Sequence, residues 1–120
     1  MSYYTPDVYH QAEQFGLTQI GQIEWAEPDY SFDIGVVWID ENGDLFYAQD
    51  AGCSCPSPFE DYTSKESLEK LTFAELQARL EKEAEEHYIS EWNTFGPTRD
   101  DLRARVVDLL AKARSAQKGV

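Results

Sequence analysis

Two cysteines, Cys53 and Cys55, are the residues with the clearest potential for chemistry, and a single serine separates them. Two thiolates at this spacing supply half of a tetrahedral zinc site, which His10, His87 or Asp50 could complete. The chain has no second cysteine pair, and its two histidines lie far apart in sequence, so the usual ligand spacing is missing. We therefore expect no bound metal. A small metal-binding protein that uses Cys53 and Cys55 stays open as an alternative.

The same thiols are poor candidates for catalysis. A reactive cysteine needs a base or positive surroundings to lower its pKa, whereas Asp50, Glu60 and Asp61 flank this pair. A disulfide between Cys53 and Cys55 would close a very tight ring, which favours reduced thiols and a cytoplasmic location. Because the chain has 23 acidic residues, carboxylate pairs arise by chance and do not indicate acid–base catalysis. We expect no enzymatic activity and no cofactor.

The charge of the chain is strongly negative and unevenly distributed. The 120 residues include 23 acidic and 10 basic side chains, for a formal net charge of −13. Residues 1–64 contain twelve acids and no Lys or Arg, residues 65–98 carry a net charge of −4, and residues 99–120 carry +3. Nucleic acids and anionic membranes both require basic patches, so neither is expected as a direct partner. A basic protein surface is the partner that this charge favours.

We predict that the binding surface combines acidic side chains with one aromatic anchor. The acids lie in and beside two predicted strands, and the aromatic residue lies near a predicted helix end, where Trp is a frequent interface anchor. The predicted contact residues are Asp29, Asp33, Asp40, Glu41, Asp44 and Trp92. A more extreme alternative is a DNA mimic, whose carboxylates imitate phosphates and thereby inhibit a DNA-binding protein.

Three predicted strands position most of these acids. Apolar runs and alternation predict strands over residues 19–26, 31–40 and 45–49. The Asn42-Gly43 pair between the last two strands predicts a hairpin, because these residues tolerate the positive φ angles of a type I′ turn. Three strands joined by tight turns indicate an antiparallel meander. Within the central strand, the predicted faces are Phe32, Ile34, Val36 and Trp38 on one side and Val37 and Ile39 on the other.

Helices are expected on either side of this meander in sequence. Thr5-Pro6-Asp7 opens a predicted helix over residues 6–15, and residues 65–71 are expected to form one or two helical turns. Thr72 and Glu75 form a capping box at the start of a helix with a stripe of Phe73, Leu76, Leu80, Ala84 and Tyr88. The last helix starts after Thr98 and carries the stripe Leu102, Val106, Leu109, Leu110 and Ala113. The expected fold is a single α+β domain over residues 1–120, with the order α-β-β-β-α-α.

Residues 50–63 are expected to form a loop that packs down and fixes where the C-terminal helices dock. Its glycine and prolines break regular structure, and its apolar side chains favour contact with the core. The residues with this structural role are Gly52, Cys53, Cys55, Pro56, Pro58 and Phe59. The N-terminus lacks the basic start and apolar core of a secretory signal, which again predicts a cytoplasmic protein. The sequence sets no oligomeric state.

The run from Gly52 to Glu60, GCSCPSPFE, resembles a signature of small proteins encoded by actinobacterial phages. The resemblance covers residues 23–63 and includes the strands that precede this run. That family is a domain of unknown function, so the resemblance implies no catalytic residues. It implies a phage product made inside an actinobacterial host. We therefore expect a non-enzymatic phage accessory protein that binds a host or phage protein through its acidic surface.

Overall fold

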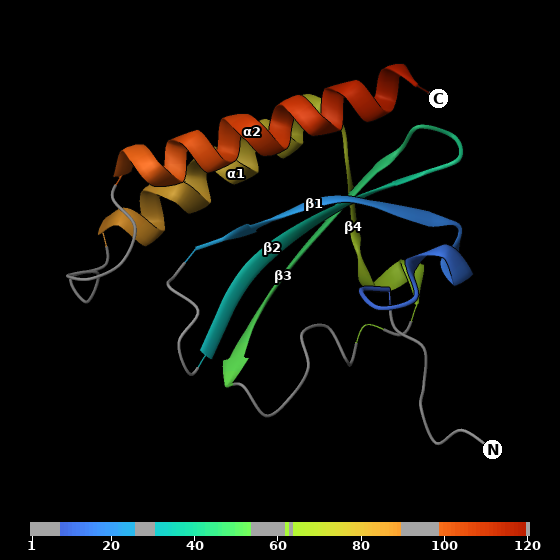
Figure 1. Ribbon diagram of the computed structural model, residues 1–120, viewed down its shortest axis with the longest axis horizontal. Coiled ribbons are helices and arrows are strands. Elements are labelled where there is room, and N and C mark those ends of the chain that lie inside the picture. Colours follow the sequence, from blue (N-terminus) through green and yellow to red (C-terminus); the bar gives the residue numbers. More distant parts are fainter. Residues whose placement is uncertain (1–7, 26–30, 54–61, 63, 90–98, 120) are drawn as a thin grey trace.

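The computed structural model describes residues 8–25, 31–53, 62, 64–89 and 99–119, with the backbone alone for residues 31–33, 51–53, 87–89 and 99. A 3₁₀ turn, η1 (Ala12–Phe15), precedes three long strands, β1 (Leu17–Glu24), β2 (Ser31–Asp40) and β3 (Leu45–Cys53). A second 3₁₀ turn, η2 (Lys65–Ser67), leads into the short strand β4 (Glu69–Leu71), and two helices follow, α1 (Phe73–Ile89) and α2 (Arg99–Lys118). The strands form one antiparallel sheet in sequence order (Figure 1).

The sheet has four strands, so the predicted three-stranded meander was wrong. The fourth strand, β4, pairs with the start of β3, with Leu45 opposite Leu71 and Tyr47 opposite Glu69. Sequence alone favoured one or two helical turns over residues 65–71, but only Lys65–Ser67 form such a turn. Three residues are too few to show alternation, and β4 exists because β3 offers an open edge to pair with.

The N-terminal helix predicted over residues 6–15 is also absent from its described part. Residues 8–11 form turns, and only Ala12–Phe15 are helical, as a single 3₁₀ turn. Tertiary hydrogen bonds explain the difference: the Val8 carbonyl accepts from Trp38 Nε1 at 3.0 Å, and the Val8 N–H donates to the Tyr62 carbonyl at 2.9 Å. The bond from Trp38 occupies the Val8 carbonyl, which would accept from the Ala12 N–H in the predicted helix, and the bond to Tyr62 fixes the completely buried Val8 to a distant segment.

The boundaries of β1 and β3 differ from expectation. β3 extends to Cys53, so Asp50 and Gly52 belong to the strand rather than to the predicted loop over residues 50–63. β1 starts at Leu17, two residues earlier than predicted, and its register with β2 shifts between Gln19 and Gly21. This irregularity explains the imperfect apolar spacing of β1, because a bulge moves the following side chains to the other face.

The β2–β3 hairpin was predicted correctly, but its turn is not the expected type I′ turn, because Asp40 pairs with Asp44 and leaves a three-residue loop that ends at Gly43. The Gly43 N–H donates to the Asp40 carbonyl at 3.1 Å, and the Asp40 N–H donates to the Asp44 carbonyl at 3.1 Å. Gly43 has a φ of 86°, a left-handed conformation that glycine adopts without steric cost. The turn therefore brings the acids at the end of β2 and the start of β3 to one tip.

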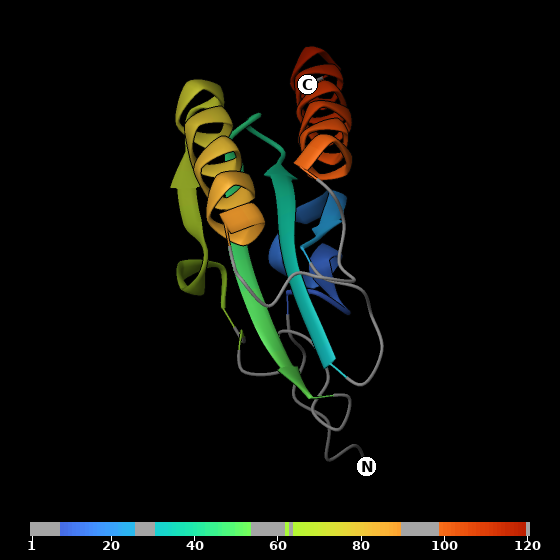
Figure 2. The ribbon, with the colours of Figure 1, turned by 90° about the vertical axis from the view of Figure 1, so that its left-hand side faces the viewer.

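Both faces of the sheet are covered. Val37, Ile39, Leu45 and Tyr47 face the two helices, while Val36 and Trp38 belong to a second cluster on the opposite face. The alternation predicted for the central strand is thus confirmed for its described side chains. Figure 2 shows α1 lying over the β3–β4 side and α2 over the β1–β2 side. The second cluster also contains Val8, Leu17, Ile34, Phe46, Ala48 and Leu68.

The two long helices agree with the sequence prediction. The capping box is present, because the Glu75 N–H donates to Thr72 Oγ1 at 3.2 Å and Glu75 Oε1 accepts from the Thr72 N–H at 2.9 Å. The described side chains of both predicted stripes face the core, with Leu76, Leu80 and Leu102 fully buried. Neither α1 nor α2 contains a segment apolar enough to cross a lipid bilayer within the described parts of the chain.

Candidate functional site

Asp40 is placed inside the hairpin rather than on its surface. Its side chain is only 5% exposed. Oδ1 accepts the backbone N–H groups of Asn42 and Asp44, each at 2.9 Å, and Oδ2 lies 3.1 Å from Lys65 Nζ. Burial alone would raise the pKa of Asp40, but the N–H of Asp44, the Lys65 ammonium and the N–H of Asn42 hold that pKa below its usual range. This carboxylate shapes the turn and is not presented for contact with a partner.

The other two acids of the hairpin are nearer to solvent. Glu41 is exposed, and the Asp44 side chain, 38% exposed, lies 3.2 Å from Lys70 Nζ on β4. An ion pair between two solvated side chains is worth at most about 1 kcal/mol, so a partner could displace Lys70 from Asp44 at little cost. Among the predicted contact residues whose side chains the structure describes, Glu41 and Asp44 are therefore the accessible ones.

The remaining predicted residues fall outside what the structure describes in detail. Asp33 lies on β2, and Gly52 and Cys53 end β3, where only the backbone is described. Six others lie outside the described residues altogether: Asp29, Cys55, Pro56, Pro58, Phe59 and Trp92. Among the side chains that are described, no group of three metal-ligating residues comes together.

A buried polar pair that the sequence analysis missed lies between the sheet and α1. The Tyr47 hydroxyl donates a short hydrogen bond to Glu83 Oε2, and the two residues are 1% and 9% exposed. Burial raises the pKa of Tyr47 far above its usual value, and the Glu83 carboxylate adds to that rise. The nearby Trp25 and the charge of Arg79 oppose it. The phenol is consequently held neutral and acts as a hydrogen-bond donor to a fixed carboxylate.

The space for this pair is created by Gly35 on the neighbouring strand. A Cβ atom at position 35 would lie 3.0 Å from two ring carbons of Tyr47, closer than ordinary carbon contacts. A small hollow of about 210 Å³ opens beside the pair and is also lined by Arg79 and Glu69. Those two are joined at 2.6 Å, and the Arg79 guanidinium lies 6.0 Å from the centre of the Tyr47 ring. The polar groups around the hollow thus satisfy one another, which is typical of a structural network.

The sequence did carry a signal for Glu83. It lies three residues after Leu80 and directly before Ala84, both of which belong to the predicted apolar stripe of α1. At helical spacing, that position faces the core. A carboxylate there requires a buried donor, and Tyr47 is the donor that the fold supplies.

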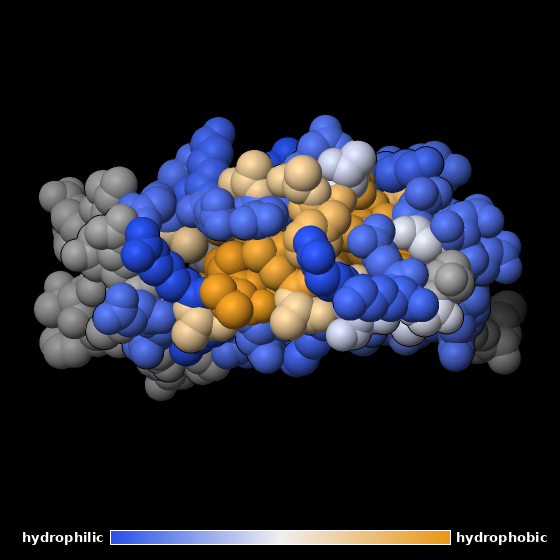
Figure 3. All heavy atoms as spheres, turned by 90° about the horizontal axis from the view of Figure 1, so that it is seen from above, coloured by the Kyte–Doolittle hydropathy of each residue, from blue (hydrophilic) through white to orange (hydrophobic). Residues whose placement is uncertain are grey.

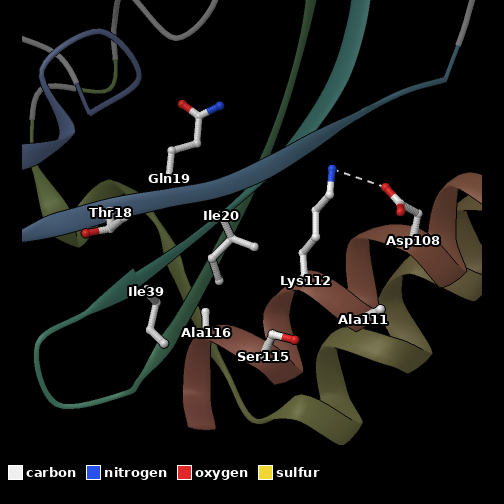
Figure 4. Close-up of a pocket in the computed structure, with 9 residues that line it drawn as sticks. All are labelled: Thr18, Gln19, Ile20, Ile39, Asp108, Ala111, Lys112, Ser115 and Ala116. Carbon is white, nitrogen blue, oxygen red and sulfur yellow. Dashed lines mark ion pairs between the residues drawn. The ribbon is translucent and has the colours of Figure 1, made fainter. Parts of the chain in front are cut away.

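A depression between the edge strand β1 and α2 has a volume of about 420 Å³ (Figure 4). Ile20 and Ile39 point from the sheet toward the helix, while Gln19 points away from it. The polar groups at its mouth include an ion pair in which Lys112 Nζ lies 3.2 Å from Asp108 Oδ2, one helical turn away. Mainly apolar walls and one exposed ion pair give this depression no arrangement of nucleophile and base.

Comparison with the curated proteins and with the solved structures returned no significant match. One family model matches residues 6–114, which is most of the chain, and its description is a domain of unknown function, DUF7574. The chain accordingly belongs to the DUF7574 family.

Proposed function

We propose that the protein is a non-enzymatic accessory protein of a phage, and that it acts by binding a basic surface of a host or phage protein. The phage origin rests on the resemblance of residues 23–63 to a signature of actinobacteriophage proteins. The binding role rests on the distribution of charge. We assign the contact surface to the accessible acids of the first 64 residues. Asp40 is left out of it, because its carboxylate accepts hydrogen bonds within its own hairpin.

The observation that carries this proposal is the excess of carboxylates over cations. If each of the ten basic residues neutralises one acid, ten of the 23 acids are neutralised. This leaves an excess of thirteen carboxylates. The first 64 residues contain no Lys or Arg, and Lys65 and Lys70 reach into this region from the rest of the chain. Glu13 on η1 and Glu41 at the hairpin tip are both exposed.

Such a surface has a defined physical effect on association. It attracts positively charged partners over a distance set by the ionic strength, about 10 Å at 0.1 M salt. Complementary charge raises the rate of association more than it slows dissociation. We therefore expect a partner with clustered Lys and Arg, and binding that weakens as salt is added.

The test is quantitative capture of partners from an actinobacterial lysate at low salt, with two charge variants that each lose three carboxylates. The first variant changes accessible acids of the first 64 residues: Glu13→Gln, Glu41→Gln and Asp44→Asn. The matched control changes three exposed acids of the helices: Glu86→Gln, Asp100→Asn and Asp108→Asn. We expect the first variant to capture at least ~10-fold less of the partner than wild type does. The amount captured by the control variant should fall less than ~2-fold.

Equal capture by both charge variants would overturn the assignment of the site. No specific partner at low salt would count against a binding role as a whole. Competition with duplex DNA separates the two versions of the proposal. If the captured protein binds DNA and the duplex displaces it, the DNA-mimic alternative replaces the general one.

A further inference from the structure

The outer surface of the two helices is distinct from the acidic region. It is formed by the solvent-facing sides of α1 and α2 and by the groove between them, and we call it the helical face. The groove has a volume of about 420 Å³ and is lined by Glu81, Ala84, Glu85, Arg103, Val106 and Val107. Figure 3 looks onto this side of the molecule and shows apolar residues gathered along its middle, between hydrophilic borders.

Val107 makes this face unusual. Its side chain is 66% exposed, and it is the one large hydrophobic side chain that is exposed in the described part of the chain. Ala104 and Ala111 are exposed three and four residues away on α2, a spacing that places all three on one side of the helix. Small side chains allow a second helix to approach closely, and Val107 stands out among them as a projecting group. A continuous apolar strip with charged borders is typical of a protein contact surface.

The two helices run antiparallel and carry opposite charge. Arg103, near the start of α2, lies 3.5 Å from Glu85 near the end of α1, and Arg114, near the end of α2, lies 4.5 Å from the ring of Phe73 at the start of α1. α1 has five acids and two bases, a net charge of −3, whereas α2 has six bases and three acids, a net charge of +3. Each helix is therefore electrostatically complementary to the other helix of a second copy.

We propose that the helical face is the contact surface of a two-fold symmetric dimer, in which α1 of each copy packs on α2 of the other. A two-fold axis that runs along the groove produces this pairing. The rotation exchanges the two sides of the groove, so that α1 of one copy lies opposite α2 of the other. Neighbouring helices in the resulting four-helix layer are all antiparallel, as in many helical bundles. A two-fold axis across the groove would instead place α1 on α1 and α2 on α2, where like charges repel.

The same axis accounts for the exposure of Val107. Val107 projects beside the groove, at the level of Glu81 and Ala84 on the opposite wall. An axis along the groove keeps each residue at its own level, so Val107 of one copy meets the groove of the other beside Ala84. The projecting Val107 and the groove that would receive it thus lie on the same surface. A two-fold symmetric contact requires this, because both copies use the same surface. The accessible acids Glu13 and Glu41 lie on elements outside this face, so the dimer leaves them open to another partner.

The test is sedimentation of the full chain from ~1 µM to ~500 µM, a range that covers weak and strong self-association. We expect a mass of twice 13.7 kDa at the upper end. Val107→Glu should raise the dissociation constant at least ~100-fold, because a buried central hydrophobic group is replaced by a charge. Gln14→Glu is the matched control: it adds the same charge at an exposed site on η1 and should leave the mass unchanged.

A charge exchange tests the orientation. Glu81→Arg and Arg103→Glu should each weaken the dimer ~10-fold or more, and the double variant should recover most of the loss. A monomer throughout the concentration range would overturn the proposal, as would a dimer that Val107→Glu does not weaken. Failure of the double variant to recover would overturn the packing of α1 on α2. Circular dichroism melting confirms that each variant is folded, which is expected because all the substituted side chains are exposed.

Discussion

Tyr47→Phe removes a single oxygen from the buried pair between the sheet and α1. The substitution keeps the ring that fills the core, so no cavity of ring size is created. It deletes the donor to Glu83 Oε2 and leaves a carboxylate that is 9% exposed without that hydrogen bond. A hydrogen bond to a charged group contributes about 1.5–3 kcal/mol. We therefore expect the free energy of unfolding to fall by about 2 kcal/mol at pH 7.

The effect of this substitution should shrink at high pH. The pKa of Tyr47 is raised above its ordinary value of 10.0, first by burial and then by Glu83. The folded state therefore keeps its proton where the unfolded state loses it. Stability from this group is fully present below pH 10 and falls as the pH rises further, by up to about 1.4 kcal/mol per pH unit. At pH 11 the difference between wild type and Tyr47→Phe should thus be about 1.4 kcal/mol smaller than at pH 7.

Urea unfolding, followed by circular dichroism at pH 7, 9, 10 and 11, measures this difference directly. Tyr62→Phe is the matched control, because the Tyr62 hydroxyl donates a long 3.3 Å hydrogen bond to the Gln49 carbonyl and is only partly buried. The control should lose less than about 1 kcal/mol at pH 7. Two results would refute the assignment of a stabilising hydrogen bond from Tyr47 to Glu83. The first is a fall in the free energy of unfolding of less than about 0.5 kcal/mol for Tyr47→Phe, and the second is a fall that is the same at pH 7 and pH 11.

Three further substitutions test other parts of the fold by the same unfolding measurement. Gly35→Ala should cost about 1–3 kcal/mol, because the new methyl group meets the ring of Tyr47; an unchanged midpoint would show that the ring moves freely. Asp40→Asn should cost about 1–2 kcal/mol at pH 7. Since the pKa of Asp40 is lowered from 3.8, that cost should be lost as the pH falls below this value, and a cost that persists at pH 2 would contradict the cause given. Thr72→Ala should cost about 1 kcal/mol by removing the cap to the Glu75 N–H, and Thr72→Ser should retain most of the stability.

The parts of the fold that sequence predicted well are those whose own periodicity is long enough to be seen. Over residues 34–39 of β2 the large side chains alternate between the two core clusters, and over α1 and α2 the apolar residues recur at helical spacing. β4 could not be found in this way, because its three residues become a strand only by pairing with β3. The N-terminal helix failed for a related reason: Trp38 and Tyr62, which are distant in sequence, bind the peptide groups of Val8.

The candidate site, like the fold, could be predicted from the sequence only in part. The acidity of the first 64 residues is a property of composition and could be predicted directly. The accessibility of each carboxylate depends instead on its partners elsewhere in the chain. Lys65, 25 residues after Asp40, donates a hydrogen bond to the Asp40 carboxylate and so helps to hold it inside the fold. The exposure of Val107 agrees with the predicted apolar stripe of the last helix, which includes the buried Val106 and omits Val107.

The claim that complementary charge brings this protein to its partner is tested most directly by the association rate as a function of salt. The rate is measured by surface plasmon resonance with the captured partner, for wild type and for the variant with Glu13→Gln, Glu41→Gln and Asp44→Asn. We predict that the wild-type rate falls ~10-fold or more between ~20 mM and ~200 mM salt, that the variant starts lower and depends less on salt, and that dissociation rates change little. Association that is independent of salt, or equally salt-dependent in both proteins, would contradict the claim.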